Sequence, residues 1–158
     1  METKSTRREA FKKIGMGLAA LFGAGSINAQ NTKSEDKKEV VGEITQDQQV
    51  PLFSGAVKHG NTLYIAGKGA HVEPFEIKAH TEIVLRKIQE ELERNGSSME
   101  QVLKVNVYLA DLADYQGMNE VFRGRFGENP PVRTTVATYG GVPGNSLVEI
   151  DCIAAVDE

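Results

Sequence analysis

Residues 103–109 read Leu-Lys-Val-Asn-Val-Tyr-Leu, a stretch in which apolar and polar side chains alternate. Because successive side chains of a β-strand point to opposite sides, Leu103, Val105, Val107 and Leu109 share one face. A strand with one apolar face packs on a second layer, so this stretch predicts a sheet that is covered on one side.

Two amphipathic helical patterns flank the alternating stretch. Before it, a helical segment that opens at Pro74 repeats apolar residues at helical spacing and stops at Asn95-Gly96. After it, Asp111 is suited to cap a second helix, which Gly127 and the following prolines end. The apolar stripe of this second helix consists of Tyr115, Met118, Phe122 and Phe126.

Four further strand-like segments complete the order. Residues 53–58 and 62–67 form a hairpin around His59-Gly60-Asn61, and residues 132–139 and 147–156 follow the second helix. The order β-β-α-β-α-β-β predicts an α+β domain with one mixed sheet and both helices on one face. The other face mixes apolar and polar residues, so we expect a homo-oligomer that packs on it.

The composition fits one globular domain: 158 residues, 40% hydrophobic and 25% charged. The single cysteine, Cys152, excludes an intramolecular disulfide and a cysteine-cluster metal site. No apolar run reaches the roughly 18 residues that a membrane span needs. Residues 30–158 carry 13 Lys and Arg against 20 Asp and Glu, and this net charge of −7 disfavours a nucleic-acid partner.

The first 29 residues predict an export signal. Five basic residues stand against two acidic ones in 1–13, an apolar run spans 14–27, and we expect a cut after Ala29. Residues 6–12, Thr-Arg-Arg-Glu-Ala-Phe-Lys, resemble the twin-arginine signal more than the general secretory one. Residues 30–48 are polar and predict a flexible leader, with the domain at 49–158. The mature protein is expected to be soluble and periplasmic.

Two charged residues lie within otherwise uncharged strand sequence. Arg133 opens one of the last two strands, and Glu149 lies within Leu147-Val148-Glu149-Ile150. Because burying an unpaired charge is costly, each needs a partner or a purpose. One alternative is a structural ion pair between the two. The other is a pocket, in which the guanidinium holds a carboxylate by two parallel hydrogen bonds and the glutamate orients water.

The other chemistry-bearing residues are expected to be structural. The sequence has no phosphate-binding loop, dinucleotide fingerprint, Gly-x-Ser-x-Gly motif or metal-binding histidine pair. His80 is expected to pack on the first helix, and Cys152 to be buried among apolar neighbours. We expect His59, in a turn, and His71, in a loop, to be solvated.

Five segments, weak singly but specific in this order, carry a resemblance: residues 51–57, 63–68, 105–112, 130–136 and 148–154. Together they resemble the RidA/YjgF (Rid) family of small enamine/imine deaminases. The resemblance implies a chorismate mutase-like homotrimer with inward-facing sheets and a site in each cleft between subunits. It implies hydrolysis of reactive 2-enamine and 2-imine acids to 2-keto acids and ammonia, without a metal or organic cofactor.

The resemblance also implies roles for individual residues. Arg133 clamps the substrate carboxylate, in a fork that lysine does not reproduce. Glu149 positions and polarises the water that attacks the imine carbon. The backbone of Gly67 lines the pocket, and the backbone carbonyl of Thr135 helps to hold the reacting nitrogen or water.

Three positions depart from the family pattern. Phe53 stands where the family usually has tyrosine, Ala66 where it has serine, and Lys68 where glutamine is common. Each missing hydroxyl contact is worth on the order of 1 kcal/mol, or about tenfold in rate. These losses favour the alternative function, a non-catalytic trimer that binds small metabolites in the same cleft.

Overall fold

The structure is a computed structural model that describes residues 37–156. The export signal predicted for residues 1–29 lies outside this range, as does the start of the predicted leader. Within residues 37–156, no helix is both long and apolar enough to cross a membrane.

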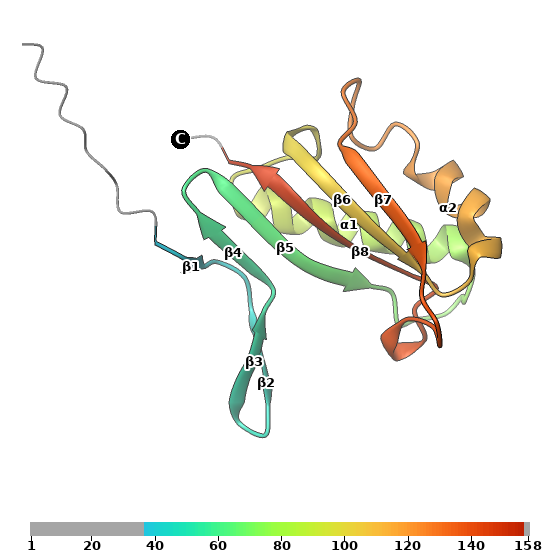
Figure 1. Cartoon of the computed structure of the whole chain (residues 1–158), viewed down its shortest axis with the longest axis horizontal. Helices are drawn as coiled ribbons and strands as arrows, with labels where there is room; N and C mark the ends of the chain where they lie inside the picture. Colours follow the sequence, from blue (N-terminus) through green and yellow to red (C-terminus); the bar gives the residue numbers. More distant parts are fainter. Residues whose placement is uncertain (1–36, 157–158) are drawn as a thin grey trace, which may run out of the picture. The chain divides into compact units, whose positions relative to one another are not determined.

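A six-stranded mixed sheet forms one layer of the domain, with the strand order β1-β4-β5-β8-β6-β7 (Figure 1). β6 and β7 run parallel, and all other neighbouring pairs are antiparallel. β7 therefore lies at one edge of the sheet and β1 at the other. The strands are β1 (Glu39–Val40), β4 (Ala56–His59), β5 (Thr62–Gly69), β6 (Val102–Leu109), β7 (Val132–Ala137) and β8 (Val148–Ala155).

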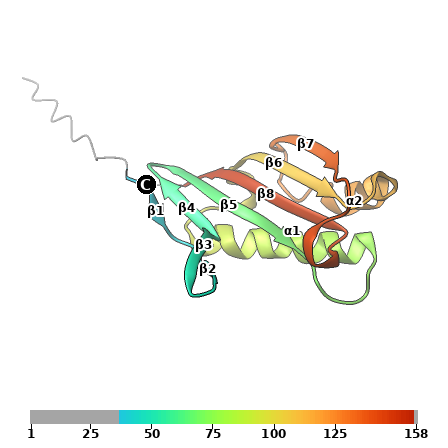
Figure 2. The same ribbon diagram turned by 60° about the horizontal axis from the view of Figure 1, so that its bottom comes forward.

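Both helices, α1 (Ile77–Arg94) and α2 (Tyr115–Phe122), lie on one face of this sheet (Figure 2). α1 ends where Asn95 and Gly96 donate their N–H groups to the last turn, and Gly96 takes a positive φ of 76° that favours glycine. The core lies between the layers and includes the fully buried Leu63, Ile88, Leu92, Val105, Val107, Met118 and Ile150. The predicted α+β architecture with two helices on one face is confirmed.

The second helix differs from its predicted form. Asp111 caps a short 3₁₀ turn, Leu112–Asp114, by accepting a hydrogen bond of 2.9 Å from the Ala113 N–H. α2 follows that turn and ends at Phe122, so Phe126 lies beyond the helix. The Phe126 side chain is buried nevertheless and stacks on Phe122 with ring centroids 4.8 Å apart.

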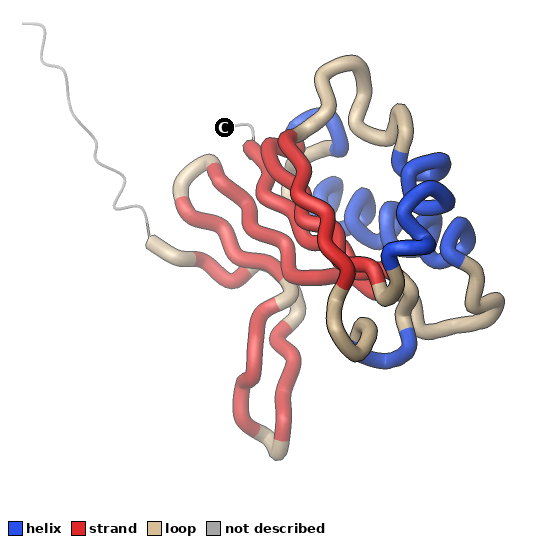
Figure 3. Tube along the Cα trace, turned by 45° about the vertical axis from the view of Figure 1, so that its right-hand side comes forward, coloured by secondary structure: helices blue, strands red, loops and turns tan. Residues whose placement is uncertain are grey.

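The N-terminal part of the domain begins earlier than the sequence predicts. β1 pairs with β4, and β2 (Ile44–Asp47) pairs with β3 (Val50–Ser54) in a separate two-stranded sheet. Figure 3 shows this hairpin projecting from the main sheet. Strands β1 and β2 thus lie within the segment predicted as a flexible leader. The predicted strand at 53–58 is also divided, because Gly55 separates β3 from β4.

The alternating stretch departs from its predicted face at one residue. Val102 pairs with Ala154 and Lys104 with Ile153, so Leu103 is the extra residue of a β-bulge. Val102 takes the buried position, and the Leu103 side chain is 53% exposed. Val105, Val107 and Leu109 share the buried face as predicted.

Candidate active site

The face of the sheet opposite the helices carries a polar cluster centred on β8. Because the strand alternates, Val148, Ile150 and Cys152 face the core while Glu149 and Asp151 face away from it. Asp151 accepts hydrogen bonds from Asn106 Nδ2 at 2.8 Å and from the Tyr108 hydroxyl at 3.0 Å. The bond to Asp151 raises the pKa of Tyr108, because it stabilises the protonated phenol.

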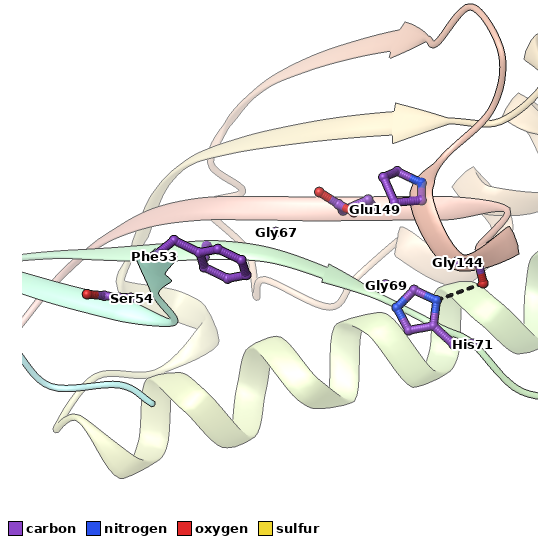
Figure 4. A pocket seen from close by; sticks show the side chains of 9 residues that line it. Phe53, Ser54, Gly67, Gly69, His71, Gly144 and Glu149 are labelled. Atoms are coloured by element: carbon purple, nitrogen blue, oxygen red, sulfur yellow. Dashed lines mark hydrogen bonds between the residues drawn. The ribbon is translucent and has the colours of Figure 1, made fainter. Parts of the chain in front are cut away.

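Glu149 lies beside this cluster in a pocket of about 660 Å³ (Figure 4). Within residues 37–156, its carboxylate has no hydrogen bond or ion pair. A partly buried carboxylate without a partner is free to act on water or a ligand. The lining residues are Phe53, Ser54, Ala66, Gly67, Gly69, His71, Pro143, Gly144 and Glu149.

A bulge in β5 builds the floor of the pocket. Ile65 pairs with Cys152 and Lys68 with Ile150, so Ala66 and Gly67 together oppose the single residue between them on β8. Bulges of this kind redirect the backbone and are common beside active sites. Here the bulge presents the backbone of Gly67 to Glu149, and Lys68 returns to the helix side, where it pairs with Glu91 at 3.2 Å.

Gly67 leaves the space that the Glu149 carboxylate occupies. A Cβ built at position 67 would lie 2.2 Å from Oε1 of Glu149, a separation that neighbouring atoms do not reach. No other residue type fits there without moving the carboxylate. Gly67 therefore leaves room for the carboxylate beside the backbone that lines the pocket.

The far end of the pocket is closed by the loop between β7 and β8. His71 Nδ1 lies 3.0 Å from the Gly144 carbonyl oxygen and donates to it (Figure 4). Ser146 fastens the same loop, since its Oγ accepts from the Ala70 N–H at 2.8 Å and donates to the Val148 carbonyl at 2.6 Å. His71 is exposed, as predicted, and it also lines the pocket, which the sequence did not predict.

His80 and Cys152 have the structural roles that the sequence predicts. His80 is fully buried, its Nδ1 accepts from the Leu147 N–H at 3.1 Å, and its Nε2 donates to the Val72 carbonyl at 3.0 Å. Both ring nitrogens of the neutral imidazole are therefore used. Burial, with the nearby Asp151 charge, raises the pKa of Cys152 to about 12, which leaves a poor nucleophile.

Arg133 and Thr135 lie on the helix-facing side of the edge strand. Arg133 pairs with Val105 and Thr135 with Val107, both of which point into the core. The Arg133 guanidinium carbon lies 4.7 Å from the centroid of the Phe122 ring, and Nη2 is 3.4 Å from the Tyr115 hydroxyl. The buried Oγ1 of Thr135 has no hydrogen-bond partner in the described part of the chain.

One chain thus brings together four of the six predicted site residues. Phe53, Ala66, Gly67 and Glu149 line the pocket, whereas Arg133 and Thr135 belong to the other face of the sheet. The alternative of a structural Arg133–Glu149 ion pair within one chain is wrong, because the strand register directs the two side chains apart.

A smaller pocket of about 140 Å³ adjoins the first. It shares Pro143 and Glu149 with the larger pocket and continues towards the Tyr108 hydroxyl. Its other lining residues are Thr138, Gly141 and Val142. Glu149 therefore lines both cavities.

Comparison with known proteins places the chain in a family. The family model for endoribonuclease L-PSP matches residues 44–156. A RutC family protein of Pyrococcus horikoshii is 38% identical over 74% of this chain and 97% of its own length. The chloroplastic Reactive Intermediate Deaminase A of Arabidopsis thaliana is 30% identical, over 85% of this chain and 73% of that protein.

Solved structures of the same family share the fold of this chain. The crystal structure of RidA from the Antarctic bacterium Psychrobacter sp. superposes with a TM-score of 0.64 at 34% identity. That match covers 75% of this chain and 99% of the other. The chain therefore belongs to the endoribonuclease L-PSP family, the RidA/YjgF family whose segments its sequence resembles.

Proposed function

We propose that the protein hydrolyses reactive 2-enamine and 2-imine acids to 2-keto acids and ammonia, in sites shared between the subunits of a homotrimer. The family includes proteins named as reactive intermediate deaminases. The observation that carries the proposal is the carboxylate of Glu149, which lies unpaired among the described residues, over the backbone of Gly67, in a pocket of about 660 Å³.

The distribution of exposed apolar side chains supports a shared site. Val132 is 70% exposed, Leu103 53%, and Tyr64 and Val136 44% each. These side chains lie on strands of a sheet whose other face the helices cover, and such a surface is typical of subunit packing. Because Arg133 lies on the edge strand β7, a second subunit packed there brings its own pocket within reach of the guanidinium.

Arg133 is suited to hold the carboxylate of the substrate. Its stacking on Phe122 and its long hydrogen bond to Tyr115 fix the plane of the guanidinium. Within residues 37–156 the other guanidinium N–H groups have no acceptor, so two parallel donors remain for a carboxylate. A 2-imino acid held in this way presents its C=N carbon to the Glu149 of the partner subunit.

The reaction then needs a base that accepts a proton from the attacking water. Glu149 accepts one proton from water, the oxygen bonds to the imine carbon, and the π electrons of the C=N bond move to nitrogen, which takes up a proton. In the second step the nitrogen gains another proton and the C–N bond breaks, with its electrons leaving on ammonia. Between the two steps Glu149 releases its first proton to solvent. Its carboxylate then accepts the proton of the hydroxyl group as the keto acid forms.

A subunit-mixing experiment tests the shared site. The variants Arg133→Ala and Glu149→Gln are each expected to be inactive when imines are generated in situ by an amino-acid oxidase and keto-acid release is followed. Co-refolding equal amounts of both should restore about a quarter of wild-type activity, because a quarter of randomly formed interfaces carry both native residues.

The control is each inactive variant refolded alone or mixed with itself, with the assembly state checked by light scattering. Mixed trimers without recovered activity would show that Arg133 and Glu149 do not act on one substrate across an interface. A wild-type protein that does not accelerate hydrolysis of any imine would overturn deamination itself.

The second candidate function is a trimer that binds small carboxylates without catalysis. It is favoured by Phe53 and Ala66, which line the pocket but supply no hydroxyl group. Calorimetry that detects 2-keto or 2-imino acids binding to a protein with no effect on hydrolysis would establish it. The net charge of −7 over residues 30–158 gives no support to a nuclease, since it repels a phosphate backbone.

A further inference from the structure

The hydrogen bond between His71 and Gly144 leaves one ring nitrogen available. A carbonyl oxygen only accepts, so Nδ1 carries the proton of this bond, 3.0 Å from the oxygen. Within residues 37–156, Nε2 of His71 has no hydrogen-bond partner. The neutral ring therefore offers Nε2 as an acceptor, and the protonated ring offers it as a donor.

Two glycines make room for the imidazole. A Cβ at Gly69 would lie 2.9 Å from Cε1 and 3.1 Å from Nε2 of His71, and a Cβ at Gly144 would lie 2.6 Å from Nδ1. Gly144 also has a positive φ of 68°. The ring is thus held between the end of β5 and the loop before β8. Any side chain at position 69 or 144 would occupy the space of the ring.

His71 and Glu149 occupy neighbouring positions along β5. The carboxylate lies over Gly67 and the imidazole over Gly69, and these two glycines face the same side of the strand with Lys68 between them. Two residues of a strand span about 6.5 Å. The acid and the imidazole are therefore spaced to lie on either side of one small reacting group.

The reaction needs protons at nitrogen that Glu149 does not supply. Glu149 acts on the oxygen, as base for the water and then for the hydroxyl group, whereas nitrogen takes up one proton in each step. A second titratable group in the same pocket meets this need, and His71 is the one other titratable side chain among the described lining residues.

We propose that His71 is a second catalytic residue of this site, and that its Nε2 supplies the protons taken up by the substrate nitrogen. In the addition step the imidazolium protonates the imine nitrogen as water adds. Exposed to solvent, the ring regains a proton and Glu149 loses one. In the collapse step Nε2 gives its proton to the amino nitrogen, the C–N bond breaks, and ammonia leaves. This role rests on the proposed deamination.

The variant His71→Asn separates proton transfer from loop anchoring. An asparagine amide nitrogen can take the place of Nδ1 and donate to the Gly144 carbonyl, but it has no counterpart of Nε2. We expect kcat to fall about 100-fold, in the range of lost general acids. KM should change less than about threefold, since the loop stays in place. His59→Asn, at the exposed end of β4 where His59 pairs with Thr62, is the matched control and should keep full activity.

The pH profile provides the second measurement. Of the charged groups around His71, Glu149 of β8 shares its pocket, and Lys87 of α1 donates to the Gly69 carbonyl at 2.7 Å. If Nε2 supplies these protons, kcat of His71→Asn should depend on pH differently from kcat of the wild type, whereas kcat of His59→Asn should follow the wild type. Added imidazolium should restore part of the lost rate.

The outcomes distinguish the two levels of the proposal. An active enzyme whose His71→Asn variant keeps the wild-type kcat and the wild-type dependence of kcat on pH would overturn the role of His71 alone. If His71→Asn instead raised KM strongly and left kcat near the wild-type value, His71 would contribute to substrate binding. That result would also overturn the proposed proton transfer. A wild-type protein without imine hydrolysis would overturn deamination, and the role of His71 with it.

Discussion

Arg133 and Glu149 point to opposite faces of the same sheet. Arg133 pairs with Val105, which faces the helices, and Glu149 pairs with Tyr108, which faces away from them. A substrate small enough for the pocket does not reach both within one subunit. A hydrolytic site that uses both residues therefore requires the edge strand of one subunit to lie against the open face of another.

Replacing Arg133 by lysine tests the clamp without removing the charge. Arg133→Lys keeps one cation but loses the two parallel donors and the planar stack on Phe122. We expect KM for 2-imino acids to rise about 10- to 100-fold, the loss of one charged hydrogen bond. Steady-state kinetics with several amino-acid oxidase substrates checks this. A variant with native KM would show that Arg133 does not contact the carboxylate.

Adding a methyl group at Gly67 tests the position of the acid. In Gly67→Ala the new Cβ would meet Oε1 of Glu149 at 2.2 Å, so the carboxylate has to move. A displacement near 1 Å costs about 100-fold in catalysis, and we expect a loss of that size in kcat. The melting temperature should change little, because Gly67 is exposed. Wild-type activity in this variant would mean that Glu149 acts from another rotamer.

Restoring the two missing hydroxyl groups tests whether the pocket lacks polar contacts. Phe53→Tyr and Ala66→Ser each add a hydroxyl to the lining of the pocket. Each is expected to raise kcat/KM by up to about tenfold, the worth of one hydrogen bond. The double variant, measured beside both single ones, shows whether the gains add. No gain from either would show that this pocket works without those hydroxyls.

Local sequence pattern was sufficient for most of the fold. The period of the apolar residues predicts α1 and β6, because each depends on neighbours within a few positions. The exposure of Leu103 and the presentation of Gly67 were missed, because both depend on bulges set by pairing with β8. No local pattern signals such an insertion.

The sequence singles out Glu149 but does not show how the candidate site is arranged around it. Glu149 was identified because an acid in an apolar run needs a purpose. Which way Arg133 points depends on the register between β6 and β7, which the sequence does not state. That His71 lines the pocket was not predicted, because its contact is with Gly144, far along the chain. The glycines at positions 67, 69 and 144 were the one feature of the sequence that could have indicated close packing of side chains around this pocket.

The pH dependence of stability should reflect Glu91, a buried acid on α1. Burial raises its pKa, but the hydrogen bond and charge of Lys68, with the charge of Arg94 and a hydrogen bond from Asn95, outweigh burial, so the pKa is lowered from 4.5. Because the folded state holds the carboxylate ionised, this contribution is fully present above the unfolded pKa. It is lost as the pH falls through the lower folded pKa.

We therefore expect the wild-type free energy of unfolding to decline as the pH falls below about 4.5, the ordinary pKa of a glutamate in an unfolded chain. Glu91→Gln should be less stable than wild type at pH 7, with the difference narrowing towards pH 3. Urea unfolding at both pH values measures it. Glu120→Gln is the matched control, because the Glu120–Lys78 pair is exposed and exposed pairs contribute little. A Glu91→Gln curve parallel to wild type at every pH would show that the Lys68–Glu91 pair does not stabilise the contact between β5 and α1.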